Sequence, residues 1–183
     1  MNLDSFIFNL FNAPAGKFWL FDWLIIFFGQ YLAYILVLGA IVLFFKEKNW
    51  RRQVYFFSLT SLSMILSRGI ITELIGLIYD RPRPFVVMEV SQLINHSSDA
   101  SFPSGHMAAF FALSLAVFYF NKKWGWWFLG GTTLMGMARI MAGFHWPSDI
   151  IAGAILGLLC VVLVDKLFLK KIKNVSDSTL KWK

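Results

Sequence analysis

The residues able to do chemistry gather in three short stretches of an otherwise apolar chain: YDRPRPF (79–85), PSGH (103–106) and ARIMAGFHWPSD (138–149). Arg83 and Arg139, in the first and third stretches, carry planar guanidinium groups that donate paired hydrogen bonds to phosphate oxygens. Ser104 and Gly105 precede an apolar run, so the positive N-terminal end of a helix is expected to face an anion there. Together these residue types favour a phosphate ester as the ligand.

Two histidines supply the groups that a phosphoryl transfer needs. Of His106 and His145, one is expected to attack phosphorus while the other protonates the leaving oxygen. Pro147 suits the first position of a helix, which places Asp149 in the first helical turn, four residues after His145. We expect the Asp149 carboxylate to accept a hydrogen bond from Nδ1 of His145 and so to orient the ring.

The carboxylates near these stretches do not form a cluster that is typical of a metal site. Those on the same predicted side are scattered along the chain, at Asp80, Glu89, Asp99 and Asp149. A divalent cation needs several oxygen ligands at one point. We therefore expect neither a required metal ion nor another cofactor.

The composition indicates which kind of protein must position these residues. The chain has 183 residues, of which 58% are hydrophobic and only 15% are charged. A soluble domain of this length needs more polar surface, so we predict an all-α integral membrane protein with residues 1–183 as a single domain. Asp4 and the absence of a basic run at the start argue against a signal peptide. Cys160 is the only cysteine and has no partner for an intramolecular disulfide.

Apolar stretches of nearly the right length predict the membrane-spanning helices. A helix needs about 20 apolar residues to cross about 30 Å of hydrocarbon. The predicted spans are about 23–45, 54–79, 105–120, 125–143 and 149–169. Residues 3–14 are amphipathic and too short to span, so they are predicted as an interfacial helix, and 174–183 as a polar tail. The predicted fold is a helical bundle of about five to six helices.

The basic residues predict the orientation of this bundle. Three clusters share one side of a five-span arrangement: Lys46, Lys48, Arg51 and Arg52; Lys122 and Lys123; Lys166, Lys170, Lys171 and Lys173. The positive-inside rule places that side, and the C-terminus, in the cytoplasm of a multi-pass inner or plasma membrane protein. The same distribution assigns the net charge of +7 to membrane topology and argues against nucleic acid as a partner.

The three reactive stretches then lie on the opposite, outer face, facing the periplasm or exterior. Each alone has an ordinary structural interpretation. Arg81 and Arg83 are suited to anchoring at the membrane interface, Ser104 to capping a helix, and His106 to an unremarkable polar contact. Convergence on one membrane face favours a common site over three unrelated features.

The combined pattern resembles the type 2 phosphatidic acid phosphatase superfamily. The matching residues are Arg83-Pro84, then Pro103-Ser104-Gly105-His106, then Arg139, His145 and Asp149 in the spacing R-x5-H-x3-D. The resemblance implies a metal-independent lipid phosphatase built as a helical bundle.

The resemblance also implies a role for each matching residue. His145 is the nucleophile that forms a phosphohistidine, oriented by Asp149, and His106 is the general acid. The phosphate is bound by Arg83, Ser104, Gly105 and Arg139.

Two positions depart from the pattern of this family. The lysine usually found seven residues before the arginine of Arg-Pro is replaced by Gly76, and the serine usually found before the third-motif arginine by Ala138. The serine accounts for one hydrogen bond, about 0.5–1.5 kcal/mol. The lysine is a phosphate-binding cation, for which Arg81 is the nearest substitute in sequence. Lys17 is the only lysine on the predicted outer side.

Two charged residues, Arg68 and Glu73, lie inside the second predicted span, where charges are costly and usually functional. On an α-helix, residues five apart point about 140° away from each other, which makes this pair poor partners. Glu73 lies one turn from Gly76, so one of the pair is a candidate to border the site. A polar contact with another helix is the structural alternative. His96, in a predicted loop, is given no role.

The substrate implied by the outer site is a membrane lipid whose head group carries a phosphate. Small size, short loops and the RPRPF run (81–85) resemble bacterial undecaprenyl-diphosphate phosphatases of this superfamily. Phosphatidylglycerophosphate, phosphatidic acid and lipid A phosphates are alternative substrates. A lipid phosphotransferase and a non-catalytic or transport-like membrane protein that retains the fold are alternative functions.

Overall fold

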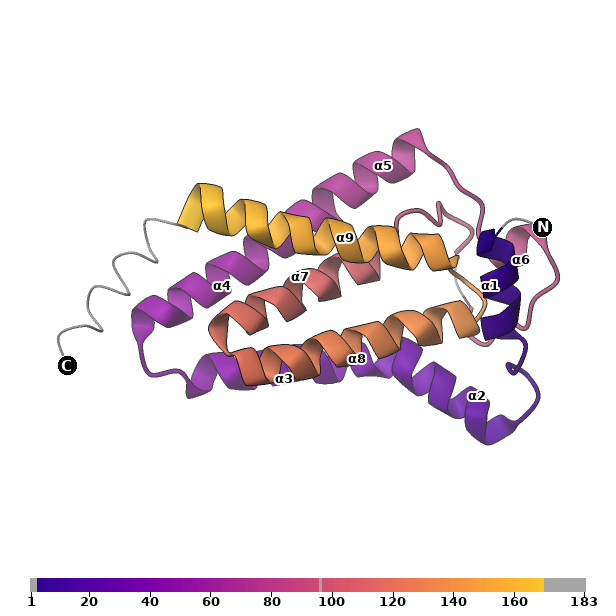
Figure 1. Ribbon diagram of the computed structural model, residues 1–183, viewed down its shortest axis with the longest axis horizontal. Helices are drawn as coiled ribbons and strands as arrows, with labels where there is room; N and C mark the ends of the chain where they lie inside the picture. Colours follow the sequence, from indigo (N-terminus) through magenta and orange to yellow (C-terminus); the bar gives the residue numbers. More distant parts are fainter. Residues whose placement is uncertain (1–2, 96, 170–183) are drawn as a thin grey trace.

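The protein is a bundle of helices in the computed structural model, which describes residues 3–95 and 97–169 (Figure 1). Every regular element among these residues is helical. The elements are α1 (Leu3–Asn12), α2 (Trp19–Ile26), η1 (Phe27–Tyr31), α3 (Leu32–Lys46), α4 (Trp50–Met64), η2 (Ile65–Thr72), α5 (Glu73–Ile78), α6 (Pro84–Val87), α7 (Gly105–Phe120), α8 (Lys122–Met141), α9 (Pro147–Val164) and η3 (Asp165–Leu169). The all-α fold predicted from composition is confirmed.

Several elements join into longer continuous helices through π-helical segments. Within the described residues, three such helices are long and apolar enough to cross a membrane: Trp19–Lys46, Trp50–Ile78 and Pro147–Leu167. Helix α7 is apolar but shorter, and α8, which carries Lys122, Lys123 and Arg139, is not among the three.

Helices lie over all five predicted spans and over the predicted interfacial segment. The number of membrane crossings stays a prediction. The short helix α6 was not predicted from the sequence, and the predicted tail 174–183 lies outside the described residues.

Helix α7 is the centre of the bundle. It packs against α4, α8 and α9, which surround it along its length (Figure 1). Its buried residues occur on every side of the helix: Met107, Ala108, Ala109, Phe110, Ala112, Leu113, Ser114, Ala116 and Val117. The PSGH stretch ends at the first turn of α7, so the reactive residues begin a helix that is enclosed on every side.

Small residues let α9 approach α7 closely. A Cβ atom added at Gly153 would lie 2.9 Å from Cβ of Met107 and closer still to the carbonyl oxygen of Ser104. One turn further on, a Cβ at Gly157 would lie 3.0 Å from the backbone nitrogen of Ala112. The two backbones are therefore in direct contact, which fixes the start of α7 relative to the start of α9.

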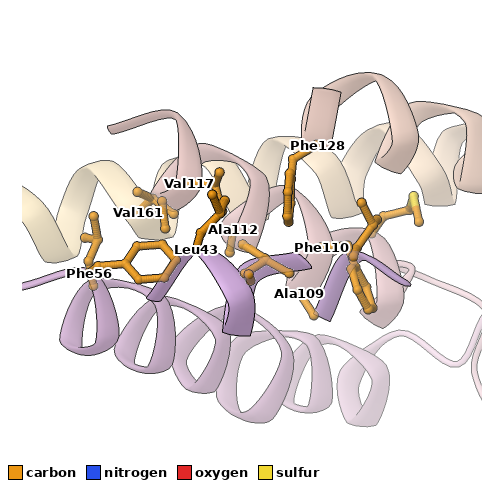
Figure 2. Close-up of a cluster of buried hydrophobic side chains, with 14 of the residues drawn as sticks. Leu43, Phe56, Ala109, Phe110, Ala112, Val117, Phe128 and Val161 are labelled. Atoms are coloured by element: carbon orange, nitrogen blue, oxygen red, sulfur yellow. The ribbon is translucent and has the colours of Figure 1, made fainter. Parts of the chain in front are cut away.

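The core beyond this contact is made of aliphatic and aromatic side chains. Figure 2 shows Phe56 of α4, Val117 of α7, Phe128 of α8 and Val161 of α9 converging with Leu43 of α3. Many other large apolar side chains point outward, among them Leu38, Leu77 and Ile155 on the longest helices. An outer surface of this kind is what contact with lipid requires. The predicted membrane protein is confirmed by these apolar helices.

Helix α1 lies across one end of the bundle, beside the starts of α6 and α9 (Figure 1). Its Phe8 is fully buried and packs on Trp146 with ring centroids 5.3 Å apart, while Leu3, Phe6 and Leu10 are exposed. This distribution agrees with the predicted amphipathic character of residues 3–14. The helix covers the end of the bundle at which the reactive stretches meet.

Candidate active site

The three reactive stretches converge at the end of the bundle that α1 covers. A cavity of about 440 Å³ opens between them. Four predicted site residues line it, namely Arg83, Gly105, His106 and His145. Residues as far apart in the chain as 68 and 145 thus contribute to one cavity.

His145 is placed by a turn that ends α8. Gly143 has a φ of +91°, a conformation that side-chain-bearing residues rarely adopt, and its N–H donates to the carbonyl of Ile140 at 3.0 Å. The chain then turns back, and His145 becomes almost completely buried, 3% exposed. Its Nε2 lies 3.4 Å from Oγ of Ser104 and 3.5 Å from Nη1 of Arg83. One ring nitrogen is therefore flanked by a hydroxyl and a cation on the cavity side.

The other ring nitrogen of His145 faces Asp149. Nδ1 lies 3.5 Å from Oδ2 of Asp149, a close approach that is longer than the hydrogen bond expected from the four-residue spacing. Asp149 is fully buried in the first turn of α9. Its carboxylate accepts hydrogen bonds from the Ser101 hydroxyl and from the backbone N–H of Trp146, the latter at 2.8 Å. These contacts hold the carboxylate behind the ring that it is predicted to orient.

Arg83 is held by a set of acceptors that the sequence did not identify. Its Nε and Nη2 donate to Oδ1 of Asp99 at 3.1 and 2.8 Å, and Nη1 donates to the carbonyl of Phe144 at 3.0 Å. The side chain is buried, with its Nη1 directed at His145. Asp99 thus fixes the fork of Arg83 beside the imidazole.

Ser104 occupies the position before α7 but does not cap the helix with its side chain. Its hydroxyl faces His145 instead, and its backbone N–H donates to the carbonyl of Asp149 at 3.0 Å. Gly105 and His106 follow on the cavity side of the first turn. The helix-capping role that is the structural alternative for Ser104 is therefore not seen in the structure.

Arg139 approaches the site from α8 and has unfilled donors. It is 5% exposed, and its guanidinium lies over the ring of Phe144, 5.0 Å from the centroid. Its Nε and Nη1 are buried without a hydrogen-bond partner among the described residues. Arg139 lines a second cavity of about 380 Å³, to which His106 also contributes. Buried guanidinium donors are costly when unpaired, so this arrangement is typical of an anion site.

Arg81 is placed away from the cavity. Its Nη1 donates to Oδ1 of Asp149 at 2.7 Å and to Oγ of Ser148 at 2.6 Å, and its Nη2 to Oδ2 of Asp4 at 2.5 Å. The guanidinium also lies over the ring of Trp146. The expectation that Arg81 substitutes for the missing lysine has no support in this geometry, because its donors are engaged by carboxylates behind His145.

Asp4 ties α1 to this network. Besides Arg81, it accepts from the backbone N–H of Ser148 at 3.0 Å and from its hydroxyl at 2.6 Å. Burial alone raises the pKa of Asp4, but the hydrogen bonds from Ser148 and Arg81 outweigh it, so the net pKa is below the ordinary value of 3.8. Helix α1 is thus connected to Asp149 through a chain of charged contacts.

The prediction that Arg68 and Glu73 are poor partners is wrong. Nη1 of Arg68 donates to Oε1 of Glu73 in an ion pair. The prediction assumed an α-helix, whereas residues 65–72 are π-helical, a geometry in which residue i is paired with residue i+5. Both side chains line the cavity, as does Gly76. We expected one of these two residues to border the site, and both Arg68 and Glu73 do so.

A comparison with known families decides the assignment of the chain. A family model described as the PAP2 superfamily matches residues 57–173, well over half of the chain and a range that contains every predicted site residue. The chain belongs to the PAP2 superfamily. The resemblance predicted from Arg83-Pro84, PSGH and R-x5-H-x3-D is thereby confirmed, and the PAP2 chain is an enzyme of the phosphoric ester hydrolase type.

Individual PAP2 relatives extend over most of the chain. It is 36% identical over 140 residues to undecaprenyl-diphosphatase BcrC of Bacillus subtilis, covering 75% of this chain and 70% of that protein. It is 30% identical over 165 residues to the bacitracin transport permease protein BcrC of Bacillus licheniformis, covering 90% of this chain and 79% of that protein. The crystal structure of Aquifex aeolicus LpxE matches with a TM-score of 0.76 at 26% identity, covering 91% of this chain and 96% of that one.

Proposed function

We propose that this chain removes the terminal phosphate of undecaprenyl diphosphate and releases undecaprenyl phosphate and inorganic phosphate. The observation that carries the proposal is the environment of His145, whose Nε2 lies between Arg83 and Ser104 while its Nδ1 faces Asp149. A nitrogen held in this way is arranged to attack phosphorus whose oxygens are bound by the same neighbours. The similarity to undecaprenyl-diphosphatase BcrC of Bacillus subtilis supports the choice of substrate.

The reaction proceeds in two displacements at phosphorus. In the first, Nε2 of His145 forms a P–N bond as the bond from phosphorus to the bridging oxygen breaks, and His106 protonates that oxygen. Undecaprenyl phosphate leaves, and the phosphoryl group remains on His145. In the second, His106 takes a proton from water, whose oxygen attacks phosphorus and breaks the P–N bond. Inorganic phosphate then leaves with both histidines restored.

The phosphate is bound by Arg83 and Ser104, which flank His145, and by Arg139, which lines the neighbouring cavity. Arg83 and the unfilled donors of Arg139 neutralise the charge on the oxygens, and Ser104 donates a hydrogen bond beside them. Gly105 begins α7, whose N-terminal N–H groups add a positive end. We expect the reaction to proceed without a metal ion and therefore in the presence of a chelator.

The site faces the outer side of the membrane in this proposal, with the C-terminus in the cytoplasm. Helix α1 lies near the cavity, whereas the basic residues that end α3 and begin α4 lie at the other end of the bundle (Figure 1). The positive-inside rule assigns that basic end to the cytoplasm. The lipid head group then reaches the cavity from the outer leaflet while its tail stays in the bilayer.

Phosphate release from the detergent-solubilised protein tests the proposal. We expect release from undecaprenyl diphosphate to fall by about 10³-fold or more in His145→Ala and in His106→Ala. Acid-labile, base-stable ³²P on the protein, found in wild type and lost in His145→Ala, is the expected sign of phosphohistidine. Equal release by wild type and His145→Ala would refute the mechanism. Phosphatidylglycerophosphate and phosphatidic acid, assayed in parallel, test the substrate.

A transport-like function is the second candidate, because one relative is named a transport permease and Gly76 replaces the usual lysine. A transporter has no need of a nucleophile and an acid placed in one cavity. Absence of phosphate release from every lipid tested, with tight binding retained, would favour this candidate. A phosphorylated second lipid among the products, detected by mass spectrometry, would indicate a phosphotransferase.

A further inference from the structure

The cations of the cavity include one residue that the motifs do not contain. Among the described residues that line the cavity, the charged side chains are Arg68, Arg83, Glu73, Asp80 and Asp99. Arginines are thus outnumbered by carboxylates, and Arg83 is already bound to Asp99. A phosphate group carrying up to two negative charges needs every available cation in such a cavity.

Arg68 lies directly over the start of α7. A Cβ atom added at Gly105 would lie 2.5 Å from Cδ of Arg68 and 3.0 Å from Cζ, so the guanidinium stem fills the space that the glycine leaves open. Gly105 is the first residue of a 16-residue helix, whose N-terminus is positive. A cation beside a positive helix end is unfavourable on its own. An anion bound between the two makes the placement favourable.

The partner that Arg68 has in this structure is readily exchanged. Its ion pair with Glu73 is about half exposed, with 47% and 58% of the two side chains accessible. Accessible pairs of this kind contribute little to stability. Glu73 therefore holds the guanidinium at the cavity without competing strongly with a doubly charged phosphate.

We propose that Arg68 binds the phosphate group of the substrate and replaces the cation that is absent at position 76. This inference rests on the proposed function and adds a residue to its binding site. The π-helical turn of residues 65–72 directs Arg68 and Glu73 to one face of the helix. Gly76, one turn beyond Glu73, lines the same cavity. The guanidinium of Arg68 then supplies positive charge to the same space that a side chain at position 76 would enter.

The first experiment compares Arg68→Gln with Glu73→Gln in the full-length detergent-solubilised protein. Arg68→Gln is expected to lower kcat/KM for undecaprenyl diphosphate by about 10- to 100-fold, and to weaken binding of inorganic phosphate, measured by calorimetry, by a similar factor. Glu73→Gln removes the competitor and is expected to bind inorganic phosphate at least as tightly as wild type. Arg51→Gln, an exposed change at the start of α4, is the matched control.

The same pair of variants separates ligand binding from structural support. If Arg68 acts only through its ion pair, both variants weaken phosphate binding equally, and the proposal is overturned. Unchanged phosphate affinity and kcat/KM in Arg68→Gln overturn it as well. Arg68→Lys keeps a positive charge and is expected to retain more phosphate affinity than Arg68→Gln, which remains informative if the glutamine variant is unstable.

A second-site rescue gives the sharpest test. A Cβ atom at Gly76 would lie 3.6 Å from Cβ of Ala100, an ordinary contact, so the backbone accepts a side chain there. The double variant Arg68→Gln/Gly76→Lys is expected to bind inorganic phosphate at least threefold more tightly than Arg68→Gln alone. No recovery from this double variant, with normal thermal stability, counts against a shared role for the two positions.

Failure of this inference is distinguishable from failure of the proposed function. Wild-type phosphate release combined with an inert Arg68→Gln change would leave the phosphatase mechanism intact and remove Arg68 from it. Absence of release from every lipid, combined with phosphate binding that depends on Arg68, would remove the mechanism and leave the binding residue.

Discussion

Replacement of Gly153 by alanine tests whether the contact between α7 and α9 positions the site. The added Cβ would lie 2.9 Å from Cβ of Met107 and closer still to the carbonyl oxygen of Ser104, whereas ordinary contacts begin near 3.4 Å. Relieving this overlap requires the start of α7 to move by about 0.5–1 Å, since core backbones have little room to adjust. We expect a stability loss of about 1–3 kcal/mol from overpacking.

The catalytic consequence follows from what the moving segment carries. Ser104 and His106 belong to α7 and its start, while Asp149 belongs to α9, so displacement changes their spacing around His145. A misplacement of about 1 Å is expected to cost about 10²-fold in kcat. The assay is phosphate release, paired with thermal unfolding in detergent.

Gly130→Ala is the matched control, because a Cβ there meets nothing within 4 Å on the exposed face of α8. It is expected to leave kcat unchanged and to raise helix stability by up to about 1 kcal/mol. If Gly153→Ala and Gly130→Ala show the same kcat and the same melting temperature, close contact at Gly153 does not position the site.

Three further predictions concern the groups around His145. Arg83→Lys is expected to lose about 100-fold in kcat/KM, because an ammonium cannot reproduce the forked contacts to Asp99; retention of activity would contradict this. Ser101→Ala removes a hydrogen-bond donor to the Asp149 carboxylate and is expected to lower kcat more than it raises KM. The carboxyl group of Asp4 has a lower pKa in the folded protein than in the unfolded protein, so its ionised form stabilises the folded state at pH values above the unfolded pKa. This stabilisation is lost as pH falls through the folded pKa, which lies below 3.8. The unfolding temperature of wild type should therefore exceed that of Asp4→Asn at pH 7, and the difference should shrink as pH falls below 3.8.

The placements that the sequence predicted correctly are those fixed by strong local signals. Gly105 is the first residue of its helix, as expected from the switch between a polar turn and an apolar run. Pro147 begins α9 and places Asp149 opposite His145 through helix geometry alone. These positions depend on backbone rules that hold within a few residues of each motif.

The residues that the sequence did not identify depend on tertiary contacts or on irregular backbone. Asp99 and Ser101 lie in a loop, where nothing in the pattern indicates which buried group they will meet. Spacing could not show that Arg81 faces the carboxylates of the network while Arg83, two residues later, faces the cavity. The pairing of Arg68 with Glu73 requires a π-helical turn, which leaves no mark in apolar periodicity.

The enclosure of α7 affects how the enzyme responds to its bilayer. With 16 residues, α7 is about 24 Å long, less than the hydrocarbon thickness of about 30 Å, whereas the 28- and 29-residue helices beside it exceed that thickness. Hydrophobic mismatch acts on helices that touch lipid, and these outer helices can absorb it by tilting. Because α7 is wrapped by its neighbours, changes in membrane thickness alter how the lipid head group reaches the cavity more than they alter the geometry of the reacting groups.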